Sequence, residues 1–205
     1  DEVVDTFHES DQATLLAELR TATWQAIDQG ISVNPVLHGF QQVVNRYGIE
    51  RELIAAFLDS MAMDLHAHRH ERQSFQTYIY GSAEVVGLMC LHVFCNGDPA
   101  QYEALKPAAQ RLGAAFQKVN FLRDLREDYH DLGRTYFPNL DLATFSPEAK
   151  RAIEAEIAED FRQAERGIRA LPKGSRLGVY VAYIYCLRLF KRIQRRPSEA
   201  LLRKR

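Results

Sequence analysis

Hydrophobic positions recur at helical spacing along most of this chain, and no stretch of useful length alternates apolar and polar residues as a half-buried strand does. In residues 50–66, for example, Leu53, Ile54, Phe57, Leu58 and Met61 lie on one side of a helix. The pattern and its turn residues predict helices over residues 10–30, 34–47, 50–66, 74–96, 100–130, 146–170 and 174–195. No repeat, low-complexity segment or linker divides the chain, so we expect one all-α domain over residues 1–205.

Residues 117–128, within the helix expected over 100–130, carry the most informative pattern. At 100° per residue, four polar side chains fall within roughly 80° of one another; they are Gln117, Asn120, Asp124 and Asp128. Much of the remaining circumference is apolar, through Phe116, Val119, Leu122 and Leu125, so the helix is expected to be buried. Two buried carboxylates at ~4 Å repel by about 4 kcal/mol at an effective dielectric near ~20, and both lose hydration. A hard divalent cation such as Mg²⁺ would compensate; the alternative is a solvated acidic helix face.

The first five residues repeat this spacing, with Asp1 and Asp5 on one helix face. Two such pairs on facing helices would form a box of four carboxylates, which can hold several divalent cations and, through them, a polyphosphate. Because chain ends fray, a metal site at residue 1 is unexpected. Either the pair is incidental or the chain has been cut from a longer protein.

Composition narrows the function classes. The 205 residues carry a formal net charge of −1, so no basic excess argues for nucleic acid. No apolar run approaches 18 residues, so we expect no membrane span. The three cysteines, Cys90, Cys95 and Cys186, form no short metal-ligand pair, which suggests buried free thiols in a reducing, cytoplasmic compartment.

Two local clusters have alternative interpretations. The basic C-terminal stretch is either a solvated helix end or a contact for diphosphate or an anionic membrane surface, and it comprises Lys191, Arg192, Arg195, Arg196, Arg203, Lys204 and Arg205. The histidines His66, His68 and His70 alternate as zinc ligands can, but only His66 and His70 share a helix face. A solvated helix end is the better interpretation of the histidines.

Four motifs, in order along the chain, resemble those of the phytoene and squalene synthase family. The stretch from Gln117 to Pro138 resembles its second aspartate-rich signature, Q-x-x-N-[IF]-[IL]-R-D-x-x-E-D followed by G-R-x-Y-[LF]-P. Residues 1–5 resemble the first signature, D-E-[LIV]-V-D, residues 61–65 the M-x-x-D stretch, and residues 78–89 the helix Y-x-Y-x-x-A-G-x-V-G-x-M. The resemblance covers essentially the whole chain and is nearest to phytoene synthase-like members from Bacteroidetes-type bacteria. Two departures are Glu84 in place of the family glycine and one extra residue between Asp128 and Arg134.

The resemblance implies the class I isoprenoid synthase fold, a helical bundle with a central cavity lined by two aspartate helices. It also implies a core fragment that lacks helices at both ends. It assigns catalytic and metal-binding roles to Asp1, Asp5, Asp124 and Asp128, with Asn120 as a further metal ligand. Substrate binding falls to Gln117, Asn120, Arg123, Arg134, Tyr136 and Asp64, and catalytic roles beside the diphosphate or the carbocation fall to Tyr78 and Tyr185. The alternative for the tyrosines is a place in the core, as it is for the candidate tail-lining residues Val85, Val86, Met89 and Phe116.

The implied activity is the Mg²⁺-dependent, head-to-head condensation of two geranylgeranyl diphosphates to phytoene through a cyclopropyl diphosphate, a step of carotenoid biosynthesis. Mn²⁺ is the alternative metal, and NADPH is not expected for phytoene formation. The rival interpretations are a squalene or dehydrosqualene synthase that uses farnesyl diphosphate, and a non-catalytic relative that keeps the fold. A di-iron carboxylate bundle is disfavoured because paired Glu-x-x-His motifs are missing. We expect a prenyl diphosphate as the partner and no nucleic acid. We expect a monomer or a homodimer, whose contact with a membrane would be at most peripheral, at the inner face.

Overall fold

The computed structural model describes residues 4, 9–65, 72–130, 136–138 and 145–202, and its regular structure in these ranges is entirely helical. The elements are α2 (Gln12–Gln29), α3 (Pro35–Tyr47), α4 (Arg51–Asp64), α5 (Arg72–Ile79), the π-helical segment η1 (Tyr80–Glu84), α6 (Val85–Cys95), α7 (Pro99–His130), α8 (Pro147–Ala170), α9 (Lys173–Gln194) and α10 (Ser198–Leu201). The helices expected from the sequence are confirmed, with bounds that agree to within two residues. The π-helical segment and α10 were not expected.

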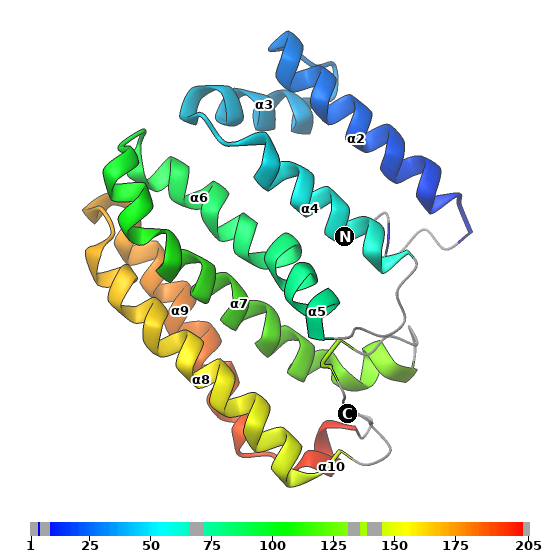
Figure 1. Ribbon diagram of the computed structural model, residues 1–205, viewed down its shortest axis with the longest axis vertical. Helices are drawn as coiled ribbons and strands as arrows, with labels where there is room; N and C mark the ends of the chain where they lie inside the picture. Colours follow the sequence, from blue (N-terminus) through cyan, green and yellow to red (C-terminus); the bar gives the residue numbers. More distant parts are fainter. Residues whose placement is uncertain (1–3, 5–8, 66–71, 131–135, 139–144, 203–205) are drawn as a thin grey trace.

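The long helices lie side by side, in the order α2, α4, α6, α7 and α8, while α9 packs against both α7 and α8 (Figure 1). The longest of them is α7, at 32 residues, and it contacts α6, η1, α8, α9 and α10. The largest hydrophobic cluster forms around it, with Val119, Leu122 and Leu125 of α7 buried at its centre. The aspartate-rich sequence of residues 117–128 therefore lies on the central helix of the bundle.

Short polar residues fix where several helices begin. Asp11, Asn34 and Ser146 precede α2, α3 and α8, and each side chain accepts a hydrogen bond from a backbone N–H group in the first turn. The turn between α6 and α7 uses left-handed backbone at Asn96 (φ 50°) and Gly97 (φ 82°), which are residue types that tolerate it. This turn reverses the chain, so that α6 and α7 form an antiparallel pair.

The helix from Arg72 to Cys95 changes its hydrogen-bond pattern in the middle, at η1. Such π-helical turns are rare and occur frequently at functional sites. By length and composition this stretch is long and apolar enough to cross a membrane, so the expectation of no such stretch was wrong. It packs between α4 and α7, and a central helix of a helical bundle meets the same criterion.

Two glycines bring three neighbouring helices close together. A Cβ atom on Gly81 of η1 would lie 2.5 Å from the carbonyl oxygen of Ala56 in α4. A Cβ atom on Gly113 of α7 would lie 2.5 Å from the carbonyl oxygen of Ala83 in η1. Both distances are shorter than real Cβ atoms tolerate, so glycine is required for η1 to lie this near to α4 and α7.

A buried ionic cluster joins α7 to α8. The Lys118 ammonium donates to Asp160 Oδ2 at 2.8 Å and also pairs with Glu156, while Arg111 Nη1 donates to Asp160 Oδ1 at 3.1 Å. Lys118 is 5% exposed and Asp160 is 1% exposed. Each buried charge thus has an opposite charge in contact, as buried ions require.

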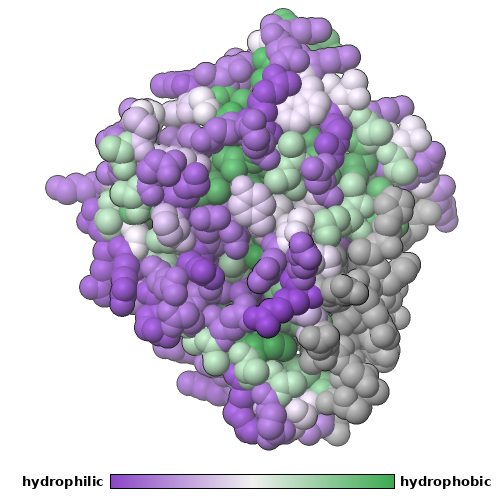
Figure 2. Space-filling model, viewed as in Figure 1, coloured by the Kyte–Doolittle hydropathy of each residue, from purple (hydrophilic) through white to green (hydrophobic). Residues whose placement is uncertain are grey.

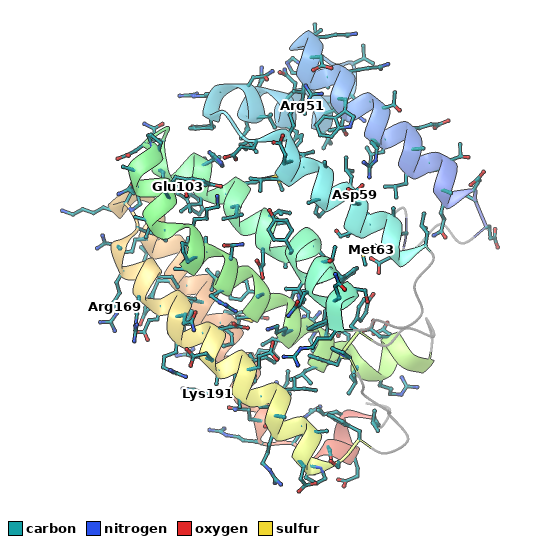
Figure 3. The ribbon with its side chains drawn as sticks, in the orientation of Figure 1. Arg51, Asp59, Met63, Glu103, Arg169 and Lys191 are labelled. Carbon is teal, nitrogen blue, oxygen red and sulfur yellow. The ribbon has the colours of Figure 1, made fainter. Side chains whose placement is uncertain are left out.

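The outer side of α8 is hydrophilic. The face of the molecule seen in Figure 2 is mostly hydrophilic, with apolar side chains visible between the helices. Arg169 lies on the outer side of α8, where it pairs with Glu165 (Figure 3). The apolar residues of α8 face α7 and α9 instead, which places the hydrophobic interior between these helices.

Candidate functional site

The acidic face of α7 is half-buried. Gln117, Asn120, Asp124 and Asp128 all lie on this helix with intermediate exposure, so the expected fully buried file of polar groups is only partly buried. The Asp124 carboxylate is held by its neighbour Arg123, whose Nε and Nη2 donate to Oδ1 at 2.8 Å and to Oδ2 at 2.6 Å. This hydrogen bonding raises the pKa of Arg123, against a lowering by burial. The charge of Asp124 is therefore balanced within the chain by a guanidinium, a group that also suits phosphate oxygens.

Asp64 at the end of α4 accepts hydrogen bonds from two tyrosines. Tyr78 Oη donates to Oδ2 at 2.8 Å, and Tyr136 Oη donates to Oδ1 at 3.2 Å. The Tyr136 ring stacks on Phe121 of α7, with ring centroids 4.1 Å apart, and lies 5.1 Å from the Tyr78 ring. The end of α4 that carries this carboxylate is marked by Met63 in Figure 3.

Asp64, Tyr78 and Tyr136 are all buried. Burial in the first place, and then the charge of Asp64, raise the pKa of Tyr78 far above its ordinary value, so the phenol stays protonated and keeps donating. These residues form an aromatic and carboxylate cluster beside the acidic face of α7, because Phe121 lies one helical turn after Gln117 and stacks on Tyr136. Their roles toward substrate stay predictions.

An apolar groove runs along α7. It has a volume of about 380 Å³ and lies between α6 with η1 on one side and α8 with α9 on the other. Its polar end is formed by Ser82 and Gln117, where Gln117 Nε2 donates to Ser82 Oγ at 3.5 Å. From there the lining is almost wholly apolar and includes Val86, Cys90, Phe94, Leu105, Leu112, Phe116, Ile168, Leu171 and Val179. This volume is within the range of small-molecule pockets.

The candidate tail-lining residues divide into two groups. Val86 and Phe116 line the groove, as expected. Val85 is fully buried, and both Val85 and Met89 belong to the hydrophobic cluster between α2, α3, α4 and α6, so those two are core residues. The reason is rotational: residues one helix position apart point about 100° apart, so Val85 and Val86 face different neighbours.

Sequence reasoning named Val86 but missed Ser82 of η1 and Cys90 and Phe94 of α6 as groove residues. Ser82, Val86, Cys90 and Phe94 recur every four residues and form one continuous face toward α7. The signal was present as an i, i+4, i+8, i+12 series. Composition could not separate this face from the core face of the same helix, because both are apolar.

Glu84, which replaces the family glycine, points toward α7 and does not line the groove. Gln110 Nε2 donates to Glu84 Oε2 at 2.9 Å, and burial raises the pKa of Glu84. The close helix approach that a glycine at residue 84 would allow is instead provided by Gly113, whose Cβ would lie 3.1 Å from the Glu84 Cα.

Tyr185 lies on an exposed face of α9. Its exposed fraction is 75%, and Leu177 and Val181, two turns and one turn earlier, are exposed at 72% and 59%. It nevertheless lies close enough to Arg123 to interact with it electrostatically, which places it near the acidic face of α7. The cysteine expectation was partly wrong: Cys95 and Cys186 are buried free thiols, but Cys90 is an exposed one on the groove.

Several predicted residues lie outside the described ranges. They are Asp1, Asp5, Arg134, the histidines His66, His68 and His70, and the last three basic residues, Arg203, Lys204 and Arg205. Val4 is described: it is buried against Leu16 and Met61.

Within the described ranges no group of three or more His, Cys, Asp or Glu could hold a metal ion. Asp124 and Asp128, one turn apart with hard oxygen donors, are of the type that Mg²⁺ prefers.

A family model described as squalene/phytoene synthase matches residues 1–205. The phytoene synthase of Pseudescherichia vulneris is 35% identical over 167 residues, which cover 79% of this chain and 52% of that protein. The chloroplastic phytoene synthase 1 of Arabidopsis thaliana is 26% identical over 213 residues, which cover 95% of this chain and 50% of that protein. The chain thus spans about half the length of these curated relatives.

Solved structures share the fold. The squalene synthase HpnC from Alicyclobacillus acidocaldarius superposes with a TM-score of 0.80 at 18% identity, over 95% of this chain and 78% of that chain. A dehydrosqualene synthase in complex with ligand gives a TM-score of 0.77 at 18% identity, over 95% and 81%. These likenesses confirm the expected isoprenoid synthase bundle. Since the family model matches all of residues 1–205, the chain belongs to the squalene/phytoene synthase family.

Proposed function

We propose that this chain forms the core of a prenyltransferase that joins two geranylgeranyl diphosphates head to head, through a cyclopropyl diphosphate, to give phytoene. In this proposal it is a phytoene synthase-like member of the family, of the type found in Bacteroidetes-type bacteria, and it acts in carotenoid biosynthesis. The observation that carries the proposal is an apolar groove whose polar end meets the aspartate-rich face of α7. Such a groove suits a ligand with a charged head and a long hydrocarbon tail.

The charged head would lie beside Asp124 and Asp128, with Asn120 and the predicted Asp1 and Asp5 completing the metal ligands. Mg²⁺ or Mn²⁺ bound there would supply positive charge that stabilises the diphosphate leaving group. Arg123, already held at this face by Asp124, presents a guanidinium for phosphate oxygens, and the predicted Arg134 would add a second.

The walls of the groove would protect the carbocation formed when diphosphate leaves. Phe116 lines the groove, and the stacked rings of Phe121 and Tyr136 lie beside the acidic face. Aromatic faces attract positive charge, and an apolar lining excludes the water that would quench it. The protonated Tyr78 donates to Asp64 and holds this carboxylate in place.

A second candidate is the condensation of two farnesyl diphosphates to squalene or dehydrosqualene. It is favoured by the similar fold of two C30 synthases, although that likeness concerns the fold alone. The two candidates differ in tail length, and squalene formation also needs NADPH.

We also propose a cytoplasmic protein, monomeric or homodimeric, with peripheral contact at the inner face of the membrane. Exposed Lys191, Arg192 and Arg195 at the end of α9 support this contact, since basic clusters are attracted to anionic lipid surfaces. Flotation with anionic vesicles tests it: co-flotation that is lost at high salt supports the contact, and no co-flotation at low salt contradicts it.

The test of the activity is product analysis. The purified protein is incubated with Mg²⁺ and geranylgeranyl or farnesyl diphosphate, without NADPH, and the hydrocarbon is identified by mass. A C40 product from geranylgeranyl diphosphate supports phytoene synthesis, and a C30 product from farnesyl diphosphate alone supports the second candidate. If the folded protein releases diphosphate from neither, the chain is a non-catalytic relative.

A further inference from the structure

We propose that Asp160 of α8 is a positioning residue for this reaction: through Arg111 and Lys118 it fixes the rotation of α7, and with it the direction of the acidic face. The inference rests on the proposed function, because it assumes that this face binds a metal–diphosphate. It goes further by giving a role to the buried ionic cluster between α7 and α8, whose residues neither line the groove nor belong to the acidic face.

Asp160 is bonded to two cations that lie two turns apart on α7. Arg111 and Lys118 are seven residues apart, so they point within about 20° of each other around the helix. Arg111 Nη1 donates to Asp160 Oδ1 at 3.1 Å, and the Lys118 ammonium donates to Oδ2 at 2.8 Å. Because one carboxylate holds α7 at two levels, a rotation of this helix would strain both contacts together.

The residues that precede these cations face η1. Gln110 Nε2 donates to Glu84 Oε2 at 2.9 Å, and Gln117 contacts Ser82. Gln110, Gln117 and Asp124 repeat at heptad spacing, so Gln110 lies on the same side of α7 as the acidic face. Since α7 lies between α6 with η1 and α8 (Figure 1), these contacts and those to Asp160 together oppose its rotation in either direction.

Stability alone does not explain why this cluster is ionic. Lys118 and Asp160 are both buried, and an apolar pair of similar volume at such a site is often as stable or more stable. Apolar cores tolerate repacking and lose a unique arrangement before they lose stability. A charged pair, in contrast, loses its contact when the helix turns, so the ionic cluster specifies one rotation of α7.

The acidic face requires a fixed rotation. Side-chain ends lie about 5–6 Å from a helix axis, so a turn of about 20° displaces carboxylate oxygens by about 2 Å. A misplacement of about 1 Å can lower a rate about 10²-fold. Lys118 lies two residues before Asn120, so the cluster acts on α7 where the acidic face begins.

The test compares two double variants that each remove a buried ion pair. Lys118→Met with Asp160→Leu removes the link between α7 and α8. Lys150→Met with Glu154→Leu is the matched control, because this buried pair lies within α8 and Lys150 also donates to the Gln194 carbonyl of α9. Urea unfolding and Mg²⁺-dependent turnover of geranylgeranyl diphosphate are measured for both.

We expect both double variants to stay close to wild-type stability, because each replaces a whole ion pair by apolar side chains. The kcat should fall at least about tenfold in the Lys118→Met, Asp160→Leu variant alone. Its KM should rise less than about threefold, because the groove that binds the tail is unchanged. A wild-type kcat in this variant, or an equal fall in the control, would overturn the inference.

A binding measurement separates the inference from the proposed function. Inorganic diphosphate with Mg²⁺ is titrated calorimetrically into each protein. Affinity about fivefold or more weaker in the Lys118→Met, Asp160→Leu variant than in the control supports the positioning role, even if the wild type turns over no prenyl substrate, a result that refutes only the proposed function. Equal affinity in the two variants, or no binding by the folded wild type, contradicts the positioning role. If the double variant does not fold, Asp160→Asn, which keeps the shape of the side chain, is judged by the same two outcomes.

Discussion

Replacing Gly113 by alanine tests the close approach of α7 to the π-helical segment η1, which positions the polar end of the groove. The added methyl carbon would lie 2.5 Å from the carbonyl oxygen of Ala83, 2.9 Å from its carbonyl carbon and 3.1 Å from the Glu84 Cα. Carbon atoms pack at about 3.5–4.0 Å, so the two backbones must separate by roughly 1 Å. All three neighbouring atoms belong to backbone, so no side-chain rotation can relieve the contact.

The expected magnitude combines two opposing effects. Overpacking of this kind costs about 1–3 kcal/mol, and alanine gains up to about 1 kcal/mol over glycine within a helix. We expect a net loss of about 1–2 kcal/mol in unfolding free energy from these two effects. Gly178→Ala in α9 is the matched control, because its Cβ would meet no heavy atom within 4 Å. This control should gain up to about 1 kcal/mol.

Urea unfolding followed by far-UV circular dichroism measures both variants under one condition. The gap between them should be about 2 kcal/mol, with Gly113→Ala the less stable. Equal stabilisation by both substitutions would refute the close approach of α7 to η1. It would also remove the physical reason given for why Ser82 and Gln117 meet.

Three further predictions concern charge and thiol chemistry. Lys118→Met leaves the buried Asp160 with one fewer cation and should lower the free energy of unfolding, measured in urea, by about 3 kcal/mol. Adding Asp160→Leu to Lys118→Met should recover most of this loss. A Lys118→Met variant as stable as the wild type would contradict the buried ion pair. Burial raises the pKa of the Glu84 carboxyl above its ordinary 4.5, so the folded state binds its proton more tightly than the unfolded state does. The stability that this protonation contributes is present below pH 4.5 and is lost as pH rises through the raised pKa. Glu84→Gln should therefore flatten the decline in unfolding free energy above pH 4.5, and unchanged slopes would refute the burial. In maleimide labelling of the native protein, Cys90 should react first, and Cys186, whose pKa burial raises to about 11, should react far more slowly; the reverse order would contradict the placement of both.

The sequence predicted the helices well because their signals are local. Breaks at Gly30 and at Asn96–Gly97, and the cap at Ser146, act on neighbouring residues and need no tertiary context. The π-helical segment was missed because its wider turn depends on packing between α4 and α7, and its sequence fits an ordinary helix.

The candidate site was predicted only in part, for a different reason. The polar face of residues 117–128 is a property of one helix and was found from spacing alone. The partners of Asp64 are not a property of one helix, because Asp64 meets Tyr78 and Tyr136 from other segments of the chain. Glu84 likewise meets Gln110 only because η1 packs on α7. Such pairings depend on how helices stack, which periodicity does not encode.

The central claim is that the acidic face of α7 and the apolar groove act together on a prenyl diphosphate. The most direct measurement is Mg²⁺-dependent diphosphate release from geranylgeranyl diphosphate, in the wild type and in the Asp124→Asn, Asp128→Asn double variant. We predict release by the wild type and a loss of at least about 10²-fold in the double variant, with an unchanged circular dichroism spectrum. Equal release by both proteins, or none by a folded wild type, would contradict the account.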